Sequence, residues 1–335
     1  MKKTYIISEI GLNHNGSIKL AKEMIIASKE SGADAVKFQK RNVDTLATDE
    51  ILNSKDNRFP EFGSTYGDIR RHLEFSKDEY KDLKNFSENL DLDFFVTAFD
   101  NQSVDFLIDV GCNTLKIASH SLTNIDLLKY IKGKFDRYFV STGMGTEEDV
   151  KLAIDILKNE KNVTFFHCVS SYPSDDSHSN LSILKSFIKR YPEVNWGYSG
   201  HEMDWLSSTT AVAVGATAVE RHFTTSRELM GFDHKISLEP KMFKSMVNDI
   251  RRIEVLIGDK TKRDLFEYEK GTKNKYHVSM ISVRDLKSGE ILTENDICWK
   301  NPGTGIMPKD SKLVINKKIM VDIPKDTLIK ESFFC

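Results

Sequence analysis

The segment Ala35-Val36-Lys37-Phe38-Gln39 is a short, largely apolar run that follows the turn-type residues Gly32-Ala33-Asp34. Side chains in a β-strand alternate between two faces, so Lys37 and Gln39 lie on one face while Val36 and Phe38 lie on the other. Polar side chains at the carboxyl end of a buried strand are typical of a parallel barrel, whose active-site face is built there. The segment therefore predicts a barrel strand that ends at a functional site.

Similar apolar runs recur along the chain and alternate with stretches of helical periodicity. Eight such runs occupy residues 5–10, 35–39, 94–97, 114–118, 137–141, 163–168, 195–199 and 218–223. The helices predicted between and after them include residues 17–30, 77–90, 147–159, 204–214 and 240–257. This alternation indicates βα units around a parallel sheet, and eight strands are the number of a (β/α)8 barrel in the α/β class.

Two regions depart from the alternation. Residues 40–75 are too long for an ordinary connection, which favours a lid or binding loop with residues 65–67 near a substrate. A charged stretch at 259–276 then ends the pattern, so we expect a barrel domain at 1–258, a linker, and a small β-rich domain at 277–335. Within the small domain, residues 283–292 are echoed by 320–329, which predicts two hairpin-like units.

Composition narrows the class of partner. The formal net charge is -2, from 48 basic and 50 acidic residues, so no global field attracts nucleic acid or a membrane. No apolar stretch approaches the roughly 20 residues of a membrane span and no signal-peptide core is present, which predicts a cytoplasmic protein with a small-molecule substrate. The four cysteines are scattered singly, so no chemical role is assigned to them.

Histidines and lysines at the strand ends suggest the chemistry. His201 follows the seventh predicted strand and His222 ends the eighth. Two neutral imidazoles with no thiolate and at most one nearby carboxylate, Glu220 or Glu9, suit octahedral Mn²⁺ or Mg²⁺ better than a closed zinc site. Lys37 and Lys116, if both enter the barrel mouth, need anions, which favours an anionic substrate. The alternatives are histidines that only pack and lysines that extend to solvent.

Segments 8–16 and 32–39 closely resemble the opening of bacterial sialic acid synthases, and matching blocks follow in the family's order. These blocks are residues 116–119, 141–144, 167–173, 197–199, 220–223 and 233–235, while Pro302-Gly303-Thr304-Gly305 resembles the signature of the C-terminal antifreeze-like (SAF) domain. The resemblance implies a TIM barrel followed by a SAF domain. It also implies a transferase that condenses phosphoenolpyruvate with the aldehyde of an N-acylated aldose, giving a nonulosonic acid and phosphate.

The resemblance further implies roles for individual residues. His201 and His222 would hold a divalent metal, Mn²⁺ first and Mg²⁺ or Co²⁺ as alternatives, that polarises the sugar aldehyde. Glu9 and Glu220 would orient water or move protons, and Tyr172 and Asp233 would face the sugar. The residues expected around phosphoenolpyruvate are Lys37, Gln39, Thr97, Lys116, Ser119, Ser141, Ser170 and Ser199. Family members are typically homodimers in which the small domain of one subunit covers the barrel mouth of the other.

Three positions depart from the family pattern. Ser121 stands where a sugar-facing Glu is usual, Gly200 where an Asp precedes the metal-binding His, and Asn301 where an Arg reaches the acyl-amino group. Each change alters the hydrogen bonds offered to a buried sugar, at about 1–3 kcal/mol per unpaired group. The acceptor is therefore expected to differ from N-acetylmannosamine. A legionaminic- or pseudaminic-type product, from an unphosphorylated or otherwise modified aldose such as a 2,4-diacetamido-trideoxy hexose, is predicted.

Two competing hypotheses remain open at this point. One is an aldolase that uses pyruvate through a Schiff base on Lys37 or Lys116. The other makes the barrel a degenerate scaffold and the small domain a carbohydrate- or ice-binding module. No dinucleotide, Walker-type, nucleophile-elbow or H-E-x-x-H motif occurs where its mechanism requires it, so nucleotide cofactors and serine or zinc hydrolysis lose support.

Overall fold

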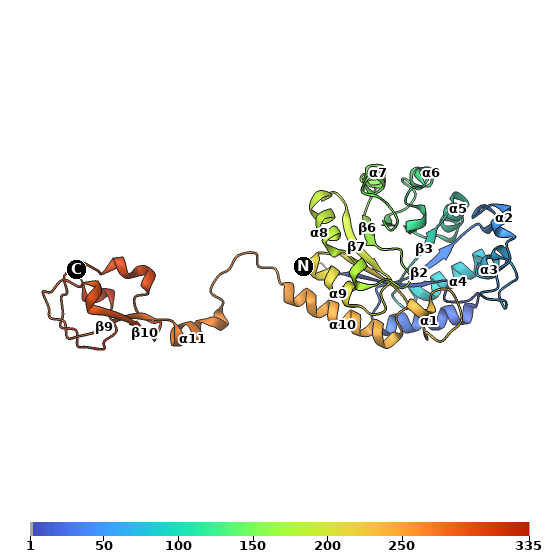
Figure 1. Ribbon diagram of the computed structural model, residues 1–335. Helices are drawn as coiled ribbons and strands as arrows, with labels where there is room; N and C mark the ends of the chain where they lie inside the picture. The colour runs from blue at the N-terminus through green and yellow to red at the C-terminus, as the bar shows by residue number, and fades with distance from the viewer. Residues whose placement is uncertain (1–2, 335) are drawn as a thin grey trace. The chain divides into compact units, whose positions relative to one another are not determined.

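A computed structural model describes residues 3–334, and its first part is a closed barrel of eight parallel strands (Figure 1). The barrel closes because β1 pairs in parallel with both β2 and β8. The strands are β1 (Tyr5–Gly11), β2 (Ala35–Lys40), β3 (Asp93–Ala98), β4 (Thr114–Ile117), β5 (Arg137–Ser141), β6 (Val163–Cys168), β7 (Asn195–Gly200) and β8 (Ala218–His222). The predicted fold class is confirmed, and each predicted strand agrees to within one residue at either end.

Helices follow the strands and cover the outside of the barrel (Figure 1). They are α1 (Ile18–Glu30), α4 (Lys77–Glu88), α5 (Asn101–Val110), α6 (Ile125–Tyr130), α7 (Glu147–Leu157), α8 (Leu181–Arg190), α9 (Leu206–Val214) and α10 (Pro240–Ile257). The predicted starts rest on capping side chains: Ser17 accepts from the backbone of Leu20, and Ser76 forms a reciprocal capping box with Glu79. Within the described residues, no helix combines the length and the apolar character needed to cross a bilayer.

The long connection after β2 is an ordered excursion with its own short helices. It contains η1 (Val43–Thr45), α2 (Asp49–Leu52) and α3 (Tyr66–His72). Ile69 of α3 and Leu73, which directly follows α3, pack on Leu12 beyond β1, with Phe232 from the loop after β8 against the same cluster. Thr65 caps α3 through the backbone of Asp68, so it has a structural role, whereas Arg70 of the same helix lines the barrel pocket.

The barrel interior is arranged in layers. Its apolar layer consists of Ile7, Ala35, Phe95, Phe139, Phe166 and Ala218. Gly197 belongs to the same level, where an added Cβ would lie 2.7 Å from the Phe166 ring, so only glycine leaves that ring its space. This layer is a packed floor rather than a channel, as expected for a barrel of eight strands.

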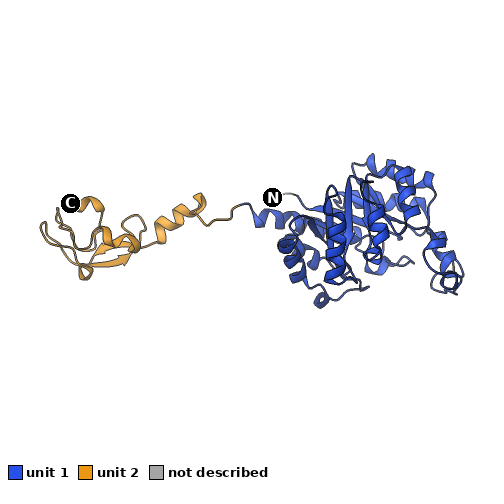
Figure 2. Cartoon of the chain, turned by 90° about the horizontal axis from the view of Figure 1, so that it is seen from above, with its two compact units in different colours: residues 1–259 blue, residues 260–335 orange. Residues whose placement is uncertain are grey.

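The chain divides into two compact units, residues 1–259 and 260–335 (Figure 2). The second unit has a short antiparallel pair, β9 (Ser279–Ser282) with β10 (Ile297–Lys300), and a core of its own around Met280 and Leu292. The stretch predicted to be a linker is partly helical, because α11 occupies Glu267–Tyr276. Its helix start is fixed by Glu269, which accepts from the backbone of Phe266 and from Arg263.

The sequence repeat in the second unit is real, but the prediction of two separate hairpins is wrong. Leu286 and Ile323, which occupy equivalent repeat positions, exchange both backbone hydrogen bonds at 2.8 Å. Asp285 accepts from the backbone of Lys325 at 2.7 Å, and the equivalent Asp322 accepts from Ser288 at 2.9 Å. The two copies therefore pair with each other about a local pseudo-twofold axis.

Phe139→Ala tests the apolar floor. The Phe139 ring is 2% exposed, and its centroid lies 5.1 Å from that of Phe95 and 5.5 Å from that of Phe166. We expect a loss of about 3–5 kcal/mol in the free energy of unfolding, because the floor cannot collapse into the cavity. Urea unfolding followed by circular dichroism measures it, with Leu152→Ala on the exposed face of α7 as control. Equal, small effects of both changes would contradict the layered interior.

Candidate active site

The polar side chains of the site form the layer directly above the apolar floor. Glu9, Lys37, Thr97, Ser141 and Glu220 each lie two residues beyond a floor residue on the same strand. Since alternate residues share a face, all five point into the barrel on the carboxyl side of the floor. In β1 a register shift between Glu9 and Gly11 accompanies this arrangement, and Gly11 takes a φ of 56°, which favours glycine.

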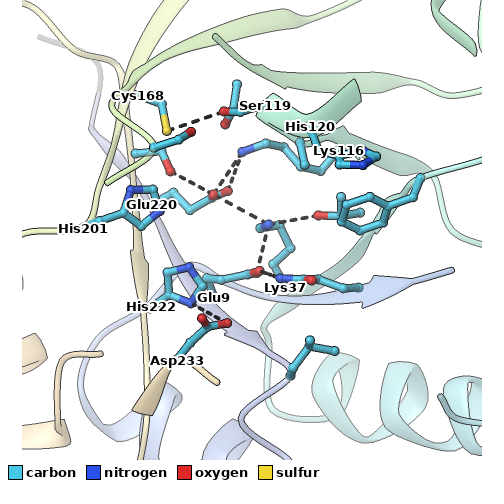
Figure 3. A pocket seen from close by; sticks show the side chains of 18 of the residues that line it. Glu9, Lys37, Lys116, Ser119, His120, Cys168, His201, Glu220, His222 and Asp233 are labelled. Carbon is cyan, nitrogen blue, oxygen red and sulfur yellow. Dashed lines mark hydrogen bonds and ion pairs between the residues drawn. The ribbon is translucent and has the colours of Figure 1, made fainter. Parts of the chain in front are cut away.

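A chain of buried charges crosses this polar layer (Figure 3). Lys116 Nζ donates to both carboxylate oxygens of Glu220, at 3.0 and 2.8 Å. Lys37 Nζ lies 2.9 Å from Glu9 Oε2, 3.6 Å from Glu220 Oε1 and 2.9 Å from Thr97 Oγ1. Ser199 donates to Glu220 at 3.1 Å, and the Lys116 ammonium lies 4.3 Å from the centre of the Phe166 ring. The floor and the charged layer are thus in direct contact.

Burial and pairing act in opposite directions on these groups. Burial disfavours the charged form of Glu220, but the positive charges of Lys116 and Lys37 outweigh this effect and lower the pKa of Glu220 to about 2. Burial raises the pKa of Glu9 despite the opposing charge of Lys37. For Lys37, burial is outweighed by Glu220 and Glu9, which raise its pKa, whereas burial prevails for Lys116 and lowers its pKa. Glu220 and Lys37 are therefore held firmly as ions.

Both lysines point into the barrel mouth, as the sequence predicted. Their burial alone, however, does not imply an anionic substrate. Each buried lysine already has a carboxylate of the protein as its partner, so desolvation alone does not demand a bound anion. The evidence for an anionic substrate is instead the net charge of the pocket, which is lined by four cationic side chains and three carboxylates. Apart from the three histidines of the pocket, this leaves one positive charge in excess.

His201 and His222 lie side by side at the mouth, with ring centroids 5.5 Å apart. His201 Nδ1 is 2.9 Å from the carbonyl oxygen of Val169, which favours a ring proton on Nδ1. Burial disfavours the charged ring, but Cys168 outweighs burial and raises the pKa of His201. Burial lowers the pKa of His222 to about 4, so this imidazole is neutral, and its buried Nδ1 has no hydrogen-bond partner. The neutral His222 ring thus has a nitrogen free for a ligand bond, and His201 offers its Nε2 when that nitrogen carries no proton.

A divalent metal fits these two rings as an open site. Within residues 3–334, no group of three or more His, Cys, Asp or Glu side chains is arranged to hold a metal ion. Two imidazole nitrogens leave most coordination positions to water and substrate oxygens, which suits Mn²⁺ or Mg²⁺ rather than a closed structural zinc. Asp233 Oδ2 lies 3.9 Å from His222 Nδ1, close enough to orient that ring. The Tyr172 ring packs against the His201 ring, with centroids 4.1 Å apart and ring planes tilted by 43°.

A cluster of small polar groups lies beside the lysines, around Ser119 (Figure 3). Ser119 Oγ accepts from the backbone of Gly143 at 3.0 Å and lies 3.6 Å from Cys168 Sγ. An added Cβ on Gly143 would lie 2.3 Å from Ser170 Oγ and 2.7 Å from Ser119 Oγ, so the close approach requires glycine. Cys168, to which the sequence assigned no role, lies in the pocket beside His201.

One pocket of about 370 Å³ brings together nearly all the predicted site residues. Those lining it are Glu9, Lys37, Gln39, Thr97, Lys116, Ser119, Ser141, Ser170, Tyr172, Ser199, His201, Glu220, His222 and Asp233. Ser121 is the exception: it is only 2% exposed, and the short helix η2 (Ser119–Ser121) presents His120 to the pocket instead. Asn301 belongs to the second unit, where it precedes a cis proline.

The departure at Gly200 has a structural counterpart. An added Cβ there would lie 2.5 Å from Glu202 Oε2, so the Glu202 carboxylate occupies the space of a side chain at 200. Glu202 accepts from Ser179 at 2.9 Å and from the hydroxyl of Tyr198. A carboxylate therefore occupies the space beside position 200, supplied from the position after His201 rather than the one before it.

Several pocket residues escaped the sequence reasoning. Arg41 and Arg70 come from the excursion after β2, Phe232 from the loop after β8, and Phe99 and His120 from the connections after β3 and β4. None ends a predicted strand. The one available signal was the length of residues 40–75, which marked a binding loop without showing which of its side chains turn inward.

Comparison with known proteins identifies the family. Residues 24–262 match the model of the NeuB family, and residues 278–334 match that of the SAF domain. This chain belongs to the NeuB family. The N,N'-diacetyllegionaminic acid synthase of Legionella pneumophila is 34% identical over 97% of this chain and 93% of its own length. The N-acetylneuraminate-9-phosphate synthase of Homo sapiens is 33% identical over 98% and 91%.

Solved NeuB-type structures share the fold. The N-acetylneuraminic acid synthetase from Leptospira borgpetersenii, crystallised with citrate, has a TM-score of 0.71 and 32% identity, covering 81% of this chain and 90% of that one. A spore coat polysaccharide biosynthesis protein E from Chromobacterium violaceum has a TM-score of 0.85 and 25% identity, covering 99% and 100%. The fold and family expected from the sequence are therefore confirmed, whereas the roles of single residues stay predictions.

Glu220→Gln and Glu9→Gln should have unequal effects on stability. Glu220 is the ion-pair partner of Lys116 within the described residues, so its loss leaves a buried ammonium uncompensated and should cost about 3–5 kcal/mol. After Glu9→Gln, Lys37 keeps Thr97 and Glu220, and we expect a cost of about 1–3 kcal/mol. Urea unfolding at pH 7 ranks the two. A larger loss for Glu9→Gln would show that the network is organised differently.

Proposed function

We propose that this NeuB-family chain condenses phosphoenolpyruvate with the aldehyde of an N-acylated aldose, releasing phosphate and a nonulosonic acid. The observation that supports it most is the meeting, in one pocket, of Lys37 and Lys116 with the imidazoles of His201 and His222. A basic, hydroxyl-rich wall suits an anionic donor, and imidazoles suit a metal that activates an aldehyde. The relatives named above are synthases of nonulosonic acids, which agrees with this reaction.

The donor is proposed to lie against the lysine side of the pocket. An ammonium has three donor hydrogens, and the hydroxyls of Thr97, Ser119, Ser141 and Ser199 surround the two lysines. Lys116 cannot move freely, because Glu220 binds it at two points. The carboxylate and phosphate of phosphoenolpyruvate would thus meet donors whose positions are set before binding, which favours charge stabilisation without rearrangement.

The reaction makes one carbon–carbon bond and breaks one carbon–oxygen bond. Carbon 3 of phosphoenolpyruvate attacks the aldehyde carbon, and the aldehyde oxygen takes up a proton. Water then adds to carbon 2, and the carbon–oxygen bond to phosphate breaks, leaving a 2-keto acid. When bound, a metal at His201 and His222 supplies Lewis-acid polarisation of the aldehyde. Mn²⁺ is the proposed ion, with Mg²⁺ and Co²⁺ as alternatives.

Glu9 is the residue proposed to orient the water. Its Oε1 accepts from Gln39 at 2.6 Å, while Oε2, 2.9 Å from the Lys37 ammonium, has no hydrogen bond of good geometry. A buried carboxylate oxygen with unused acceptor capacity can receive a water proton. Glu220, bound twice by Lys116 and once by Ser199, has less capacity left and is proposed to act chiefly by holding the lysines.

The finer parts of the proposal concern assembly and acceptor. We propose a homodimer in the cytoplasm, in which the SAF unit of each subunit covers the pocket of its partner and contributes Asn301. Tyr172 and Asp233 are proposed to contact the sugar, which is an N-acetylmannosamine-like or 2,4-diacetamido-type aldose. Light scattering in solution tests the dimer, and an Asn301→Ala change that leaves the KM for every sugar unaltered would remove this residue from the acceptor site.

The central test is sugar-dependent release of phosphate. The protein is incubated with Mn²⁺, a panel of N-acylated six-carbon sugars, and phosphoenolpyruvate labelled with ¹⁸O in the bridging position. We expect phosphate release that depends on one class of sugar, with the label in the phosphate because the carbon–oxygen bond breaks. The same slow release with every sugar and with none would refute condensation. A product trapped on Lys37 or Lys116 by borohydride with pyruvate would favour a Schiff-base aldolase instead.

His222→Ala tests the metal proposal without relying on activity. We expect it to lower Mn²⁺ affinity at least about tenfold, because half of the proposed protein ligands are lost, and to abolish condensation. Electron paramagnetic resonance of free Mn²⁺ measures the binding, and His178→Ala, an exposed histidine outside the pocket, is the matched control. Unchanged Mn²⁺ binding by His222→Ala would rule out the metal site.

A further inference from the structure

Two arginines line the pocket and take no part in the lysine–carboxylate network. Arg41 follows β2 immediately, and Arg70 lies on α3. Arg41 is only 8% exposed, and burial, together with the charge of Arg70, lowers its pKa to about 10, so it stays a cation at neutral pH. The two guanidinium groups therefore bring two positive charges to the same pocket.

Neither arginine has an ion-pair partner among residues 3–334. The charge of Glu74 acts on Arg41, but its carboxylate accepts hydrogen bonds only from the Arg41 backbone and pairs with Lys40 at 2.6 Å. Arg41 Nη1 and Arg70 Nε are buried and have no hydrogen-bond partner. A buried guanidinium donor without a partner is costly, at about 1–3 kcal/mol or more, so this arrangement points to a ligand that supplies the missing acceptors.

Aromatic rings hold both guanidinium groups in place. The Arg41 group stacks over Phe99 at 4.0 Å, and its Nη2 donates to Gln39 Oε1. Arg70 lies over Phe232 at 4.5 Å, next in sequence to Asp233. Stacked guanidinium groups keep their in-plane donors free, and this is the geometry that binds carboxylates and phosphates in a fork.

We propose that Arg41 and Arg70 bind an oxyanion, a phosphate or a carboxylate, carried by the acceptor sugar at the end away from its aldehyde. This inference rests on the condensation proposed above and narrows its acceptor to an anionic aldose. The donor's anionic groups are matched by Lys37 and Lys116 above the floor, whereas the arginines come from segments beyond the strand ends. Arg70 stacks on the loop that carries Asp233, which is the side proposed for the sugar.

Substrate preference and two variants test the subsite. The probes are N-acetylmannosamine, its 6-phosphate and the corresponding uronic acid, which separates a phosphate from a carboxylate. We expect the intact enzyme to use one anionic sugar with at least tenfold higher kcat/KM than the neutral one. Arg41→Gln and Arg70→Gln should each lower that kcat/KM by roughly 10- to 100-fold, mainly through KM, since a bond to a charged group is lost. The loss of kcat/KM with the neutral sugar should be at least about fivefold smaller than the loss with the anionic one.

Arg71→Gln is the matched control, because Arg71 lies on the same helix but pairs with Asp44 and does not line the pocket. A preference for the neutral sugar, or equal losses with both sugars, would overturn the inference. A rise in the KM for phosphoenolpyruvate alone would assign the arginines to the donor and overturn it as well. If no sugar releases phosphate, the condensation fails separately. In that case, calorimetry measures the binding of the three sugars to the intact protein and to both arginine variants. Weaker binding of the anionic sugar by the variants supports the subsite, and unchanged binding overturns it.

Discussion

The ion pairs between two lysines and two glutamates inside the barrel are the constraint on which the site depends. Four ionisable side chains can be buried above an apolar floor because Lys116 binds Glu220 at two points and Lys37 lies between Glu220 and Glu9. Their positions require β1, β2, β4 and β8 to close in one register. The same register brings Ser199 to Glu220 and sets His222 beside Glu9 on the neighbouring strand. Closing the barrel and assembling the pocket are therefore a single event.

Much of this could be predicted from the sequence, because barrel strands carry their function at fixed positions. A period of two places Glu9 above Ile7 and Lys37 above Ala35, and strand-end histidines mark the mouth. The pairing of Lys116 with Glu220 could not be predicted, since β4 and β8 are not neighbours and no spacing relates them. That His120 rather than Ser121 lines the pocket could not be predicted either, because it is decided by one turn of 3-10 helix. Arg41 and Arg70 could not be predicted as pocket residues, because the connection after β2 that carries them has no strand periodicity.

The second unit shows a similar limit. The echo of residues 283–292 at 320–329 correctly indicated a repeat, and its turn positions Gly289 and Asp326 both adopt positive φ. Sequence similarity between two copies does not say whether each folds on itself or pairs with the other. Leu286 and Ile323 pair, because each copy alone has too little apolar surface to form a core, whereas together they enclose Leu292 and Ile329.

Cationic side chains in one pocket can thus have different roles, and the groups that contact each cation show which role it has. Lys37 and Lys116 are neutralised by the protein, so their charge is first a part of the fold and only then a resource for binding. Arg41 and Arg70 are held by aromatic rings, which fix a guanidinium group without neutralising it. Their unused donors lower the stability of the empty pocket, and a ligand that satisfies them gains that energy on binding. Unpaired charge, rather than charge as such, therefore indicates where a substrate's own charge belongs.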